Sequence, residues 1–290
     1  MPDIRLIAAD MDGTLLNEQG KISPRTLRAI QKAQEKGIIF SMCTGRFPEH
    51  CLAFAREAGL KCSVISSNGS VAYDGQSGRI IAQHLMPAAS AWQVWQLVRR
   101  YPLKCRVTMP GCYVDRYQEP LDFTSHFNYI SQIMNRDYDV AYETGEEAME
   151  RRMRQPIYKT YIYPFDSPEA RERMRHELEQ IPGISVTSSG PRNVETMPVG
   201  VDKGTGLAEL AAFYGIPLEN VMAFGDYDND LPMLRRAGYP VAMGNAKEDV
   251  KRAAWRVTAP NTEDGLAQAI EKYVLSLLNA CCAAAQQDGA

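Results

Sequence analysis

Residues 4–14 read Ile-Arg-Leu-Ile-Ala-Ala-Asp-Met-Asp-Gly-Thr, so the apolar run Ile4–Ala9 leads directly into two carboxylates, Asp10 and Asp12. Such a run indicates a β-strand that is covered on both faces, as in a parallel sheet. Two carboxylates ~4 Å apart repel each other by about 4 kcal/mol when the effective dielectric is roughly 20. We therefore expect a cation or a protonated group beside the pair. Once balanced, such a pair can supply a nucleophile together with an acid or base.

The segments after this strand alternate between helical and strand patterns. Ser23 and Pro24 supply a helix N-cap and a first-turn proline. Two further apolar strands are predicted at residues 38–43 and 62–66, with a helix over residues 49–58 between them. This βαβαβ order predicts a parallel sheet with right-handed crossovers.

The middle of the chain has a different pattern, because its strands alternate apolar and polar residues. Alternation predicts a sheet with one exposed face, hence a separate α+β domain. The α/β pattern returns with a helix over residues 203–214 and an apolar strand at 221–224. We therefore expect an α/β fold with a Rossmann-like parallel-sheet core from residues 1–83 and 191–290, and an inserted α+β cap domain over residues 84–190.

Composition and charge exclude several classes of protein. The 290 residues are 45% apolar and 23% charged, as in an ordinary globular protein with one large or two moderate domains. A net charge of -3 lacks the basic excess of a nucleic-acid binder. The seven cysteines form no Cys-x-x-Cys pair, which predicts reduced thiols and no zinc framework.

The ends of the chain bear on its location. Arg5 and Asp10 interrupt the first apolar stretch, so no signal peptide is expected, and no run reaches the ~18 apolar residues of a membrane span. Residues beyond about 279, rich in alanine and glutamine, predict a frayed tail. We expect a cytoplasmic protein with no membrane, nucleic-acid or obligatory protein partner.

Further chemically active residues follow predicted strands or begin a helix: Thr44, Gly45, Asp226 with Asp230, and Lys203. Open α/β sheets bind ligands at the carboxyl ends of their strands, so these groups are expected to converge on Asp10 and Asp12. Each residue alone would also suit a turn, a helix cap or a solvated surface. Lys203 carries an added argument, because a cation at a helix start is disfavoured by ~0.3–1 kcal/mol unless an anion lies nearby.

The acidic run 225–230 could be mistaken for a calcium loop. Leu231 stands where that loop requires glycine, and Ala237 stands where it requires a bidentate glutamate. The chain also lacks the Gly-x-x-x-x-Gly-Lys-Ser/Thr pattern of a P-loop. A magnesium site with a few carboxylates and several waters fits this run better.

Five ordered motifs carry a family resemblance: Asp10-x-Asp12-Gly-Thr-Leu-Leu, Thr44-Gly45-Arg46, Asn68-Gly69, Asp202-Lys203-Gly204 and Gly225-Asp226-x-x-Asn229-Asp230. They resemble the successive motifs of the haloacid dehalogenase superfamily, and the resemblance spans nearly the whole chain. The long insert between the second motif and the lysine resembles the Cof-type sugar-phosphatase branch, with a large type-two cap of subclass B. The fold implied is the core with an inserted cap described above.

The resemblance implies that Asp10 is a nucleophile that attacks the phosphorus of a phosphate monoester and forms an aspartyl-phosphate. Asp12 would act first as general acid and then as general base. Its pKa would have to rise from about 4 for this role, and the neighbouring anion is one way to raise it. Mg²⁺ would be held by a carboxylate oxygen of Asp10, the main-chain carbonyl of Asp12, and Asp226, with Asp230 nearby or acting through water.

The resemblance also implies which residues bind the substrate. The phosphoryl oxygens would be held by Thr44, Gly45, Lys203 and Asn229. Arg46 and Asn68 are additional substrate-binding candidates. Specificity would come from the cap, where the candidates Tyr113, Arg116, His126 and Lys159 are not ranked by the sequence.

The function predicted is a magnesium-dependent phosphatase of small phosphate monoesters, with sugar phosphates favoured. Asp12 distinguishes it from a dehalogenase, which needs no second acid. A sugar-phosphate phosphomutase and a phosphatase of a phosphorylated cofactor such as pyridoxal phosphate are the alternatives. A response-regulator receiver and a catalytically silent binding protein fit less well, because the receiver fold is shorter and a silent protein has no need of the intact motifs.

Overall fold

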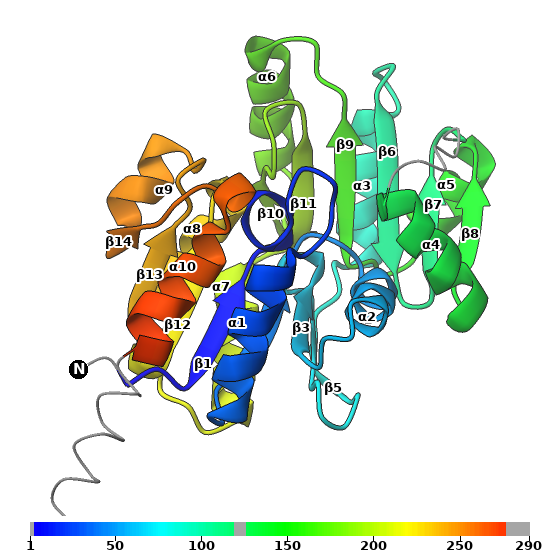
Figure 1. Ribbon diagram of the computed structural model, residues 1–290. Helices are drawn as coiled ribbons and strands as arrows, with labels where there is room; N and C mark the ends of the chain where they lie inside the picture. Colours follow the sequence, from blue (N-terminus) through cyan, green and yellow to red (C-terminus); the bar gives the residue numbers. More distant parts are fainter. Residues whose placement is uncertain (1–2, 119–125, 277–290) are drawn as a thin grey trace, which may run out of the picture.

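The computed structural model describes residues 3–118 and 126–276, which form two β-sheets (Figure 1). The first sheet has eight strands in the spatial order β14 (Arg256–Val257), β13 (Tyr239–Ala242), β12 (Val221–Gly225), β1 (Leu6–Ala9), β2 (Ile39–Cys43), β3 (Ser63–Ser66), β4 (Val71–Tyr73) and β5 (Ile80–Gln83). The strands from β14 to β3 are parallel, and β4 and β5 pair antiparallel at one edge. The parallel-sheet prediction is therefore confirmed.

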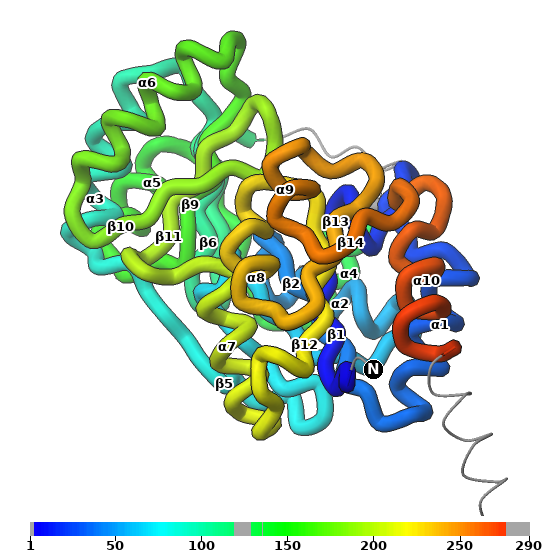
Figure 2. The backbone as a smooth tube through the Cα atoms, turned by 90° about the vertical axis from the view of Figure 1, so that its left-hand side faces the viewer, coloured from blue at the N-terminus to red at the C-terminus, as the bar shows by residue number. Residues whose placement is uncertain are grey.

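Helices cover both faces of the first sheet, which explains why its central strands are apolar throughout. The helices are α1 (Pro24–Glu35), α2 (Pro48–Glu57), α7 (Lys203–Phe213), α8 (Leu231–Arg236), α9 (Glu248–Ala253) and α10 (Gly265–Ile270). In Figures 1 and 2, α1 and α10 lie on one face while α7 and α8 lie on the other. All four residues of β1 are fully buried, so its carboxyl end is fixed within the core.

The second sheet has six strands in the order β10 (Ile184–Thr187), β11 (Val194–Pro198), β9 (Lys159–Tyr163), β6 (Lys104–Met109), β7 (Cys112–Asp115) and β8 (Ala141–Thr144). It is antiparallel except for the pair of β7 and β8. Helices α3 (Ala88–Val98), α5 (Glu146–Arg152) and α6 (Pro168–Glu179) cover its outer face (Figure 2). The other face is turned toward the carboxyl edge of the first sheet.

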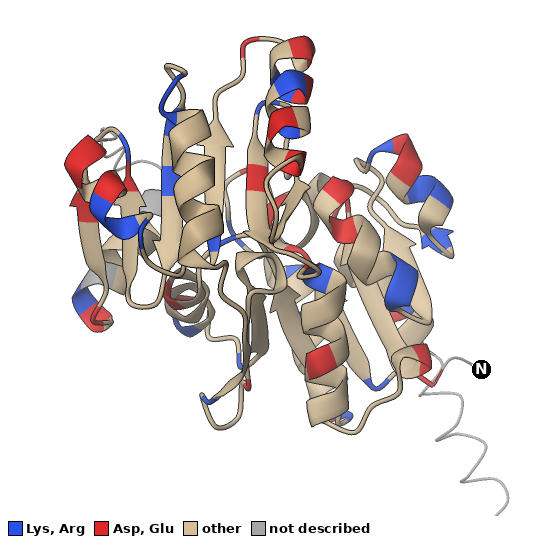
Figure 3. Ribbon diagram, turned by 180° about the vertical axis from the view of Figure 1, so that it is seen from behind, with Lys and Arg blue, Asp and Glu red and all other residues tan. Residues whose placement is uncertain are grey.

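Helix α6 carries acidic and basic residues close together (Figure 3). One helix links the two sheets: α4 (His126–Asp137) packs against α2, and an ion pair of 3.1 Å joins Arg56 to Asp137. Next to it, the rings of Phe47 and Tyr113 stack with centroids 5.0 Å apart. The six-stranded sheet is thus packed against the loop that follows β2.

The structure corrects one assignment and adds elements that we did not predict. Residues 194–198, which we placed in the core, form β11 of the six-stranded sheet, so that sheet extends beyond residue 190. The strand reads Val-Glu-Thr-Met-Pro, and all five of its residues are buried. We did not predict helix α3, because it is apolar on nearly all sides and has no side-chain N-cap. Within the described ranges, no helix is long and apolar enough to cross a bilayer; the predicted tail lies outside them.

Candidate active site

The carboxyl ends of β1 and β12 bring two of the predicted carboxylates side by side. These strands pair in parallel with Ala9 opposite Phe224, so the chain continues into Asp10 and, one residue after Gly225, into Asp226. Gly13 then turns the backbone with φ +84°, and a Cβ there would lie 2.5 Å from a carboxylate oxygen of Asp226. Only glycine allows this approach.

Lys203 provides the cation that the sequence required. It is the first residue of α7, whose N-cap Asp202 accepts a hydrogen bond from a backbone N–H. Its side chain is fully buried, and Nζ lies 2.5 Å from Asp10 Oδ1 and 2.6 Å from Asp230 Oδ1. Burial lowers the pKa of Lys203, but the charges of the two carboxylates outweigh it and hold that pKa well above its usual value. Lys203 is therefore a charged residue of the site rather than a surface lysine.

Three carboxylates surround this lysine, so their negative charge exceeds its positive charge. Asp10, Asp226 and Asp230 each place an oxygen within 4.8 Å of the others. Burial raises the pKa of Asp10 well above its usual value, and burial together with the charge of Asp230 raises the pKa of Asp226 to about 7. Such shifts show that the negative charge is only partly balanced. A set of carboxylate oxygens is the donor set that Mg²⁺ prefers, so these residues fit that ion.

The three carboxylates are not equally placed to bind a metal. Asp230 Oδ2 accepts hydrogen bonds from the backbone N–H groups of Asp226 (2.8 Å) and Tyr227 (3.0 Å), and its Oδ1 is held by Lys203. Asp226 accepts only a bond of 2.9 Å from the Thr14 hydroxyl in the part of the chain that the structure describes. Asp10 and Asp226 are therefore the better placed ligands, and Asp230 orients them.

The pKa of Asp12 is shifted in the opposite direction to the one that we expected. Arg46 grips its carboxylate with two hydrogen bonds, 2.9 Å from Nε and 2.5 Å from Nη2. Desolvation raises the pKa of Asp12, but the charge and hydrogen bonds of Arg46 outweigh it and lower that pKa. We expected a neighbouring anion to raise this pKa, and in this structure the nearer cation decides the direction instead. The proposed contribution of its main-chain carbonyl to a metal site stays a prediction.

The remaining predicted residues form the loops next to these carboxylates. Thr44 is buried after β2, and its hydroxyl accepts a bond of 3.2 Å from the backbone N–H of Arg46. Asn68 adopts a left-handed conformation with φ 55°, and its amide oxygen accepts a bond of 3.3 Å from Asn229. Thr44, Gly45, Arg46 and Asn229 line one cavity with Asp10 and Asp12.

Two residues of the six-stranded sheet complete this edge, and sequence reasoning singled out only one of them. Lys159 of β9 donates 2.9 Å to the main-chain carbonyl of Gly45 and 2.7 Å to Glu195 of β11. Glu195 also binds the Asn68 side-chain amide and the Ser189 hydroxyl. Burial raises the pKa of Glu195, but Lys159 and these donors lower it below its usual value. No motif in the sequence marks Glu195, which lies within the short buried strand β11.

Three further residues of the inserted unit were candidates for substrate specificity: Tyr113, Arg116 and His126. Arg116 faces away from the cavity, donating to the main-chain carbonyls of Tyr101 and Leu103 and pairing with Glu146, so it is structural. Tyr113 stacks on Phe47. The side chain of His126 lies outside the described part of the structure.

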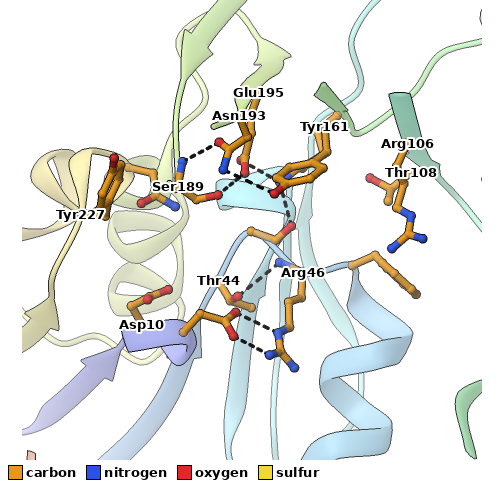
Figure 4. A pocket seen from close by; sticks show the side chains of 15 residues that line it. Asp10, Thr44, Arg46, Arg106, Thr108, Tyr161, Ser189, Asn193, Glu195 and Tyr227 are labelled. Carbon is orange, nitrogen blue, oxygen red and sulfur yellow. Dashed lines mark hydrogen bonds and ion pairs between the residues drawn. The ribbon is translucent and has the colours of Figure 1, made fainter. Parts of the chain in front are cut away.

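The cavity has a volume of about 350 Å³ and is lined from both sheets (Figure 4). The first sheet and its loops contribute Asp10, Asp12, Thr44, Gly45, Arg46, Phe47, Tyr227 and Asn229. The second contributes Arg106, Thr108, Lys159, Tyr161, Ser189, Asn193 and Glu195. This arrangement places two carboxylates, the Arg46 guanidinium and hydrogen-bonding groups at one end of a pocket of small-molecule size.

Comparison with known proteins decides the family. The sequence profile of the haloacid dehalogenase-like hydrolases matches residues 7–270. The chain belongs to this family. Among solved structures, a haloacid dehalogenase-like hydrolase from Bacillus subtilis superposes with a TM-score of 0.81 at 27% identity, covering 93% of this chain and 100% of the other. A subclass IIB sugar phosphatase of the haloacid dehalogenase superfamily superposes with a TM-score of 0.76 at 26% identity, with 93% and 98% covered.

Curated relatives of this haloacid dehalogenase-like hydrolase are named phosphatases. A 5-amino-6-(5-phospho-D-ribitylamino)uracil phosphatase of Bacillus subtilis is 30% identical, with 94% of this chain and 97% of the relative covered. A pyridoxal phosphate phosphatase of Escherichia coli is 28% identical, with 93% and 99% covered. Together with the family match, these relatives show a phosphatase that acts on phosphoric monoesters.

Proposed function

We propose that this phosphatase is magnesium-dependent and hydrolyses small phosphate monoesters through an aspartyl-phosphate on Asp10. The observation that carries the proposal is the buried contact of Lys203 with Asp10 and Asp230, beside a cavity lined by Thr44 and Asn229. The lysine orients the Asp10 carboxylate, and the neighbouring donors suit a phosphoryl group. We further propose that the six-stranded sheet with its helices acts as a cap over this site.

The covalent steps use the side chains of the chain itself. A carboxylate oxygen of Asp10 attacks phosphorus while the bond to the ester oxygen breaks, and the leaving alkoxide takes a proton from Asp12. Water then attacks phosphorus, Asp12 removes the proton of that water, and Asp10 is released with inorganic phosphate. Thr44, Asn229 and Lys203 stabilise the charge on the phosphoryl oxygens.

Arg46 adds a requirement to the first step, because Asp12 must be protonated when it acts as an acid. The guanidinium group that now holds Asp12 ionised must release it. A bound phosphoryl group is an anion that can compete for this arginine, since guanidinium groups bind phosphate in a bidentate fashion. Substrate binding would thus free the acid where it is needed.

Asp10 and Asp226, oriented by Asp230, would hold the magnesium ion. When bound, the ion neutralises repulsion between carboxylates and phosphate and polarises a phosphoryl oxygen. The substrate proposed is a small phosphorylated metabolite. Sugar phosphates are favoured, and a phosphorylated cofactor such as pyridoxal phosphate is the alternative, because relatives and structural neighbours are named for both kinds of substrate.

The test is release of inorganic phosphate from p-nitrophenyl phosphate and from a panel of sugar phosphates and pyridoxal phosphate. We expect EDTA to stop release and Mg²⁺ to restore it. An unchanged rate in the chelator would remove the metal from the mechanism. Conversion of glucose 1-phosphate to an isomeric phosphate, rather than to free phosphate, would identify a phosphomutase instead.

A further inference from the structure

The wall of the cavity opposite Asp10 is formed by one face of the six-stranded sheet. Arg106 and Thr108 lie two residues apart on β6, so their side chains project from the same face. Arg106 pairs in register with Asp115 on one side and Tyr161 on the other. Figure 4 shows Arg106 and Thr108 at the end of the cavity remote from Asp10.

The Arg106 guanidinium is held in a fixed position. Nε and Nη2 donate 2.7 Å each to the two oxygens of Asp115, whose side chain is only 4% exposed. Asp115 also accepts a bond of 3.2 Å from the Tyr142 hydroxyl, which fixes the carboxylate in turn. An ordinary surface ion pair lacks such support. A rigid arginine fork of this kind is suited to recognition.

Hydrogen-bonding capacity on this wall is left over. Within residues 3–118 and 126–276, Nη1 of Arg106 has no hydrogen-bond partner. The Arg106 side chain is 21% exposed and lines the cavity. The buried Thr108 hydroxyl also lacks a partner among the described residues. An unsatisfied buried hydroxyl costs ~1–3 kcal/mol and is uncommon in native proteins. Both groups are therefore available to a ligand that fills this end.

The charges on the wall indicate what kind of group the ligand presents. Arg106 is balanced by Asp115, and Lys159 is balanced by Glu195 at 2.7 Å. Among the wall residues that the structure describes, these pairs leave no net positive charge for a second phosphate or a carboxylate. The complementary group is an uncharged acceptor oxygen, because Nη1 can only donate.

We propose that Arg106, positioned by Asp115, is a specificity-determining residue that binds a hydroxyl or carbonyl oxygen on the part of the leaving group remote from the phosphate. The proposal rests on the proposed function, since it assumes that the phosphoryl group occupies the Asp10 end. A leaving group long enough to span the cavity gains this hydrogen bond, whereas a short one does not. Arg106 thus selects by length as well as by polarity.

Arg106→Lys tests this hydrogen bond, because it keeps a positive charge beside Asp115 while it removes Nη1 and the bidentate fork. The probes are sorbitol 6-phosphate, which is long and hydroxylated, and glycerol 3-phosphate, which is short. We expect kcat/KM for sorbitol 6-phosphate to fall about tenfold through a higher KM, equivalent to about 1.4 kcal/mol. For glycerol 3-phosphate the change is expected to be less than about twofold.

Two further variants separate recognition from folding. Asp115→Asn leaves Arg106 in place but loosens it, so a smaller loss with the same preference for the long substrate is expected. Arg99→Lys alters another arginine–carboxylate pair of the same sheet unit that does not line the cavity, and should change neither substrate. Thermal unfolding of each variant monitors the fold.

The outcomes distinguish this proposal from the proposed function. Hydrolysis of p-nitrophenyl phosphate by the wild-type protein supports the phosphatase mechanism independently of Arg106. Equal losses for both probes in Arg106→Lys, no loss for either, or a wild-type preference for glycerol 3-phosphate would each overturn the role of Arg106. Failure of the wild-type protein to hydrolyse any ester would overturn the proposed function, and the inference with it.

Discussion

The carboxyl edge of the first sheet and the inner face of the second line the same cavity, yet they balance charge differently. At the edge, Asp10, Asp226 and Asp230 share one buried lysine, and two of these carboxylates have raised pKa values. On the face, each buried carboxylate has its own cation, as in the pair of Lys159 and Glu195. The edge therefore carries carboxylate charge that an added cation would balance, while the face is balanced by itself. In the functions that we propose, the edge that carries out the reaction has excess negative charge, and the face that contacts the leaving group has none.

Replacement of the nucleophile should have the largest effect. Asp10→Asn removes the attacking oxygen and is expected to lower magnesium-dependent release of phosphate from p-nitrophenyl phosphate at least about a thousandfold. Asp228→Asn is a matched control, because Asp228 lies close in sequence to Asp226 but pairs with Lys247 outside the cavity. Turnover near the wild-type rate in Asp10→Asn would contradict the assignment of the nucleophile.

The two buried lysines offer a direct test of the comparison. Lys203→Met should lower kcat at least about a hundredfold, because it removes a charge that stabilises the transition state. Lys159→Met should lower kcat much less, since Lys159 contacts the main-chain carbonyl of Gly45 and the Glu195 carboxylate, and not Asp10 or Asp230.

Stability distinguishes the same two variants. Each leaves buried carboxylate charge unpaired, so each should lose about 3–5 kcal/mol in the free energy of unfolding without metal. We expect Mg²⁺ to restore part of this loss in Lys203→Met and none in Lys159→Met, as measured by urea unfolding. Equal recovery in both variants would show that the two regions do not differ as described.

A smaller effect is expected at Thr14, whose hydroxyl orients Asp226. Thr14→Val should raise the Mg²⁺ concentration for half-maximal activity by about tenfold, as loss of a residue that supports a metal ligand commonly does. Thr14→Ser keeps the hydroxyl and should behave as wild type. An unchanged Mg²⁺ requirement in the valine variant would argue against Asp226 as a ligand.

The smallest effect is a pH dependence of opposite sign in the two regions. The pKa of Asp226 is about 7 in the folded state against a usual value of 3.8, so metal-free protein should gain stability as pH falls from 8 to 5. The slope is at most about 1.4 kcal/mol per pH unit. Glu195 has a lowered pKa, so its contribution is present above its unfolded pKa and is lost only as pH falls below that value.

Variants assign these slopes to residues. Asp226→Asn should reduce the gain in stability between pH 8 and 5 to the part that Asp10 contributes, whereas Glu195→Gln should leave the gain in place and alter only the acid end. Urea unfolding at each pH in EDTA measures both. An unchanged slope in Asp226→Asn would show that Asp226 does not contribute to it.

The same contrast explains what the sequence could predict. Asp10, Thr44 and Asp226 directly follow strands of a parallel sheet, so their convergence follows from topology before any side chain is placed. Glu195 and Arg106 sit within antiparallel strands, where only the register shows that both lie opposite Tyr161 of the strand between them. An alternating strand looks the same whether its polar face meets water or a cavity. The fold and the convergence of these residues at the carboxyl edge were therefore predictable, whereas the polar groups of the inner face were not.

The pairing of individual side chains, such as Arg46 with Asp12, could not be predicted from the sequence either. The hydrogen bonds between Arg46 and Asp12 reversed the expected direction of a pKa shift, because a contact over 34 positions depends on the final geometry of two loops. The boundary of the inserted unit was misplaced for a related reason. Strand β11 is joined closely in sequence to α7, yet it pairs with β9 in the other sheet.

The hydrogen bond from Lys159 to the Gly45 carbonyl has a consequence for protein engineering. A loop predicted to hold the phosphoryl group is braced by a residue that belongs to the inserted unit. A Cβ on Gly45 would come within 3.0 Å of both Lys159 Nζ and Asn68 Oδ1, so loop and insert are fitted to each other. The two units are thus not freely interchangeable modules. In a chimera that carries a foreign insert on this core, the insert must therefore have a lysine at the position of Lys159 and a carboxylate at the position of Glu195.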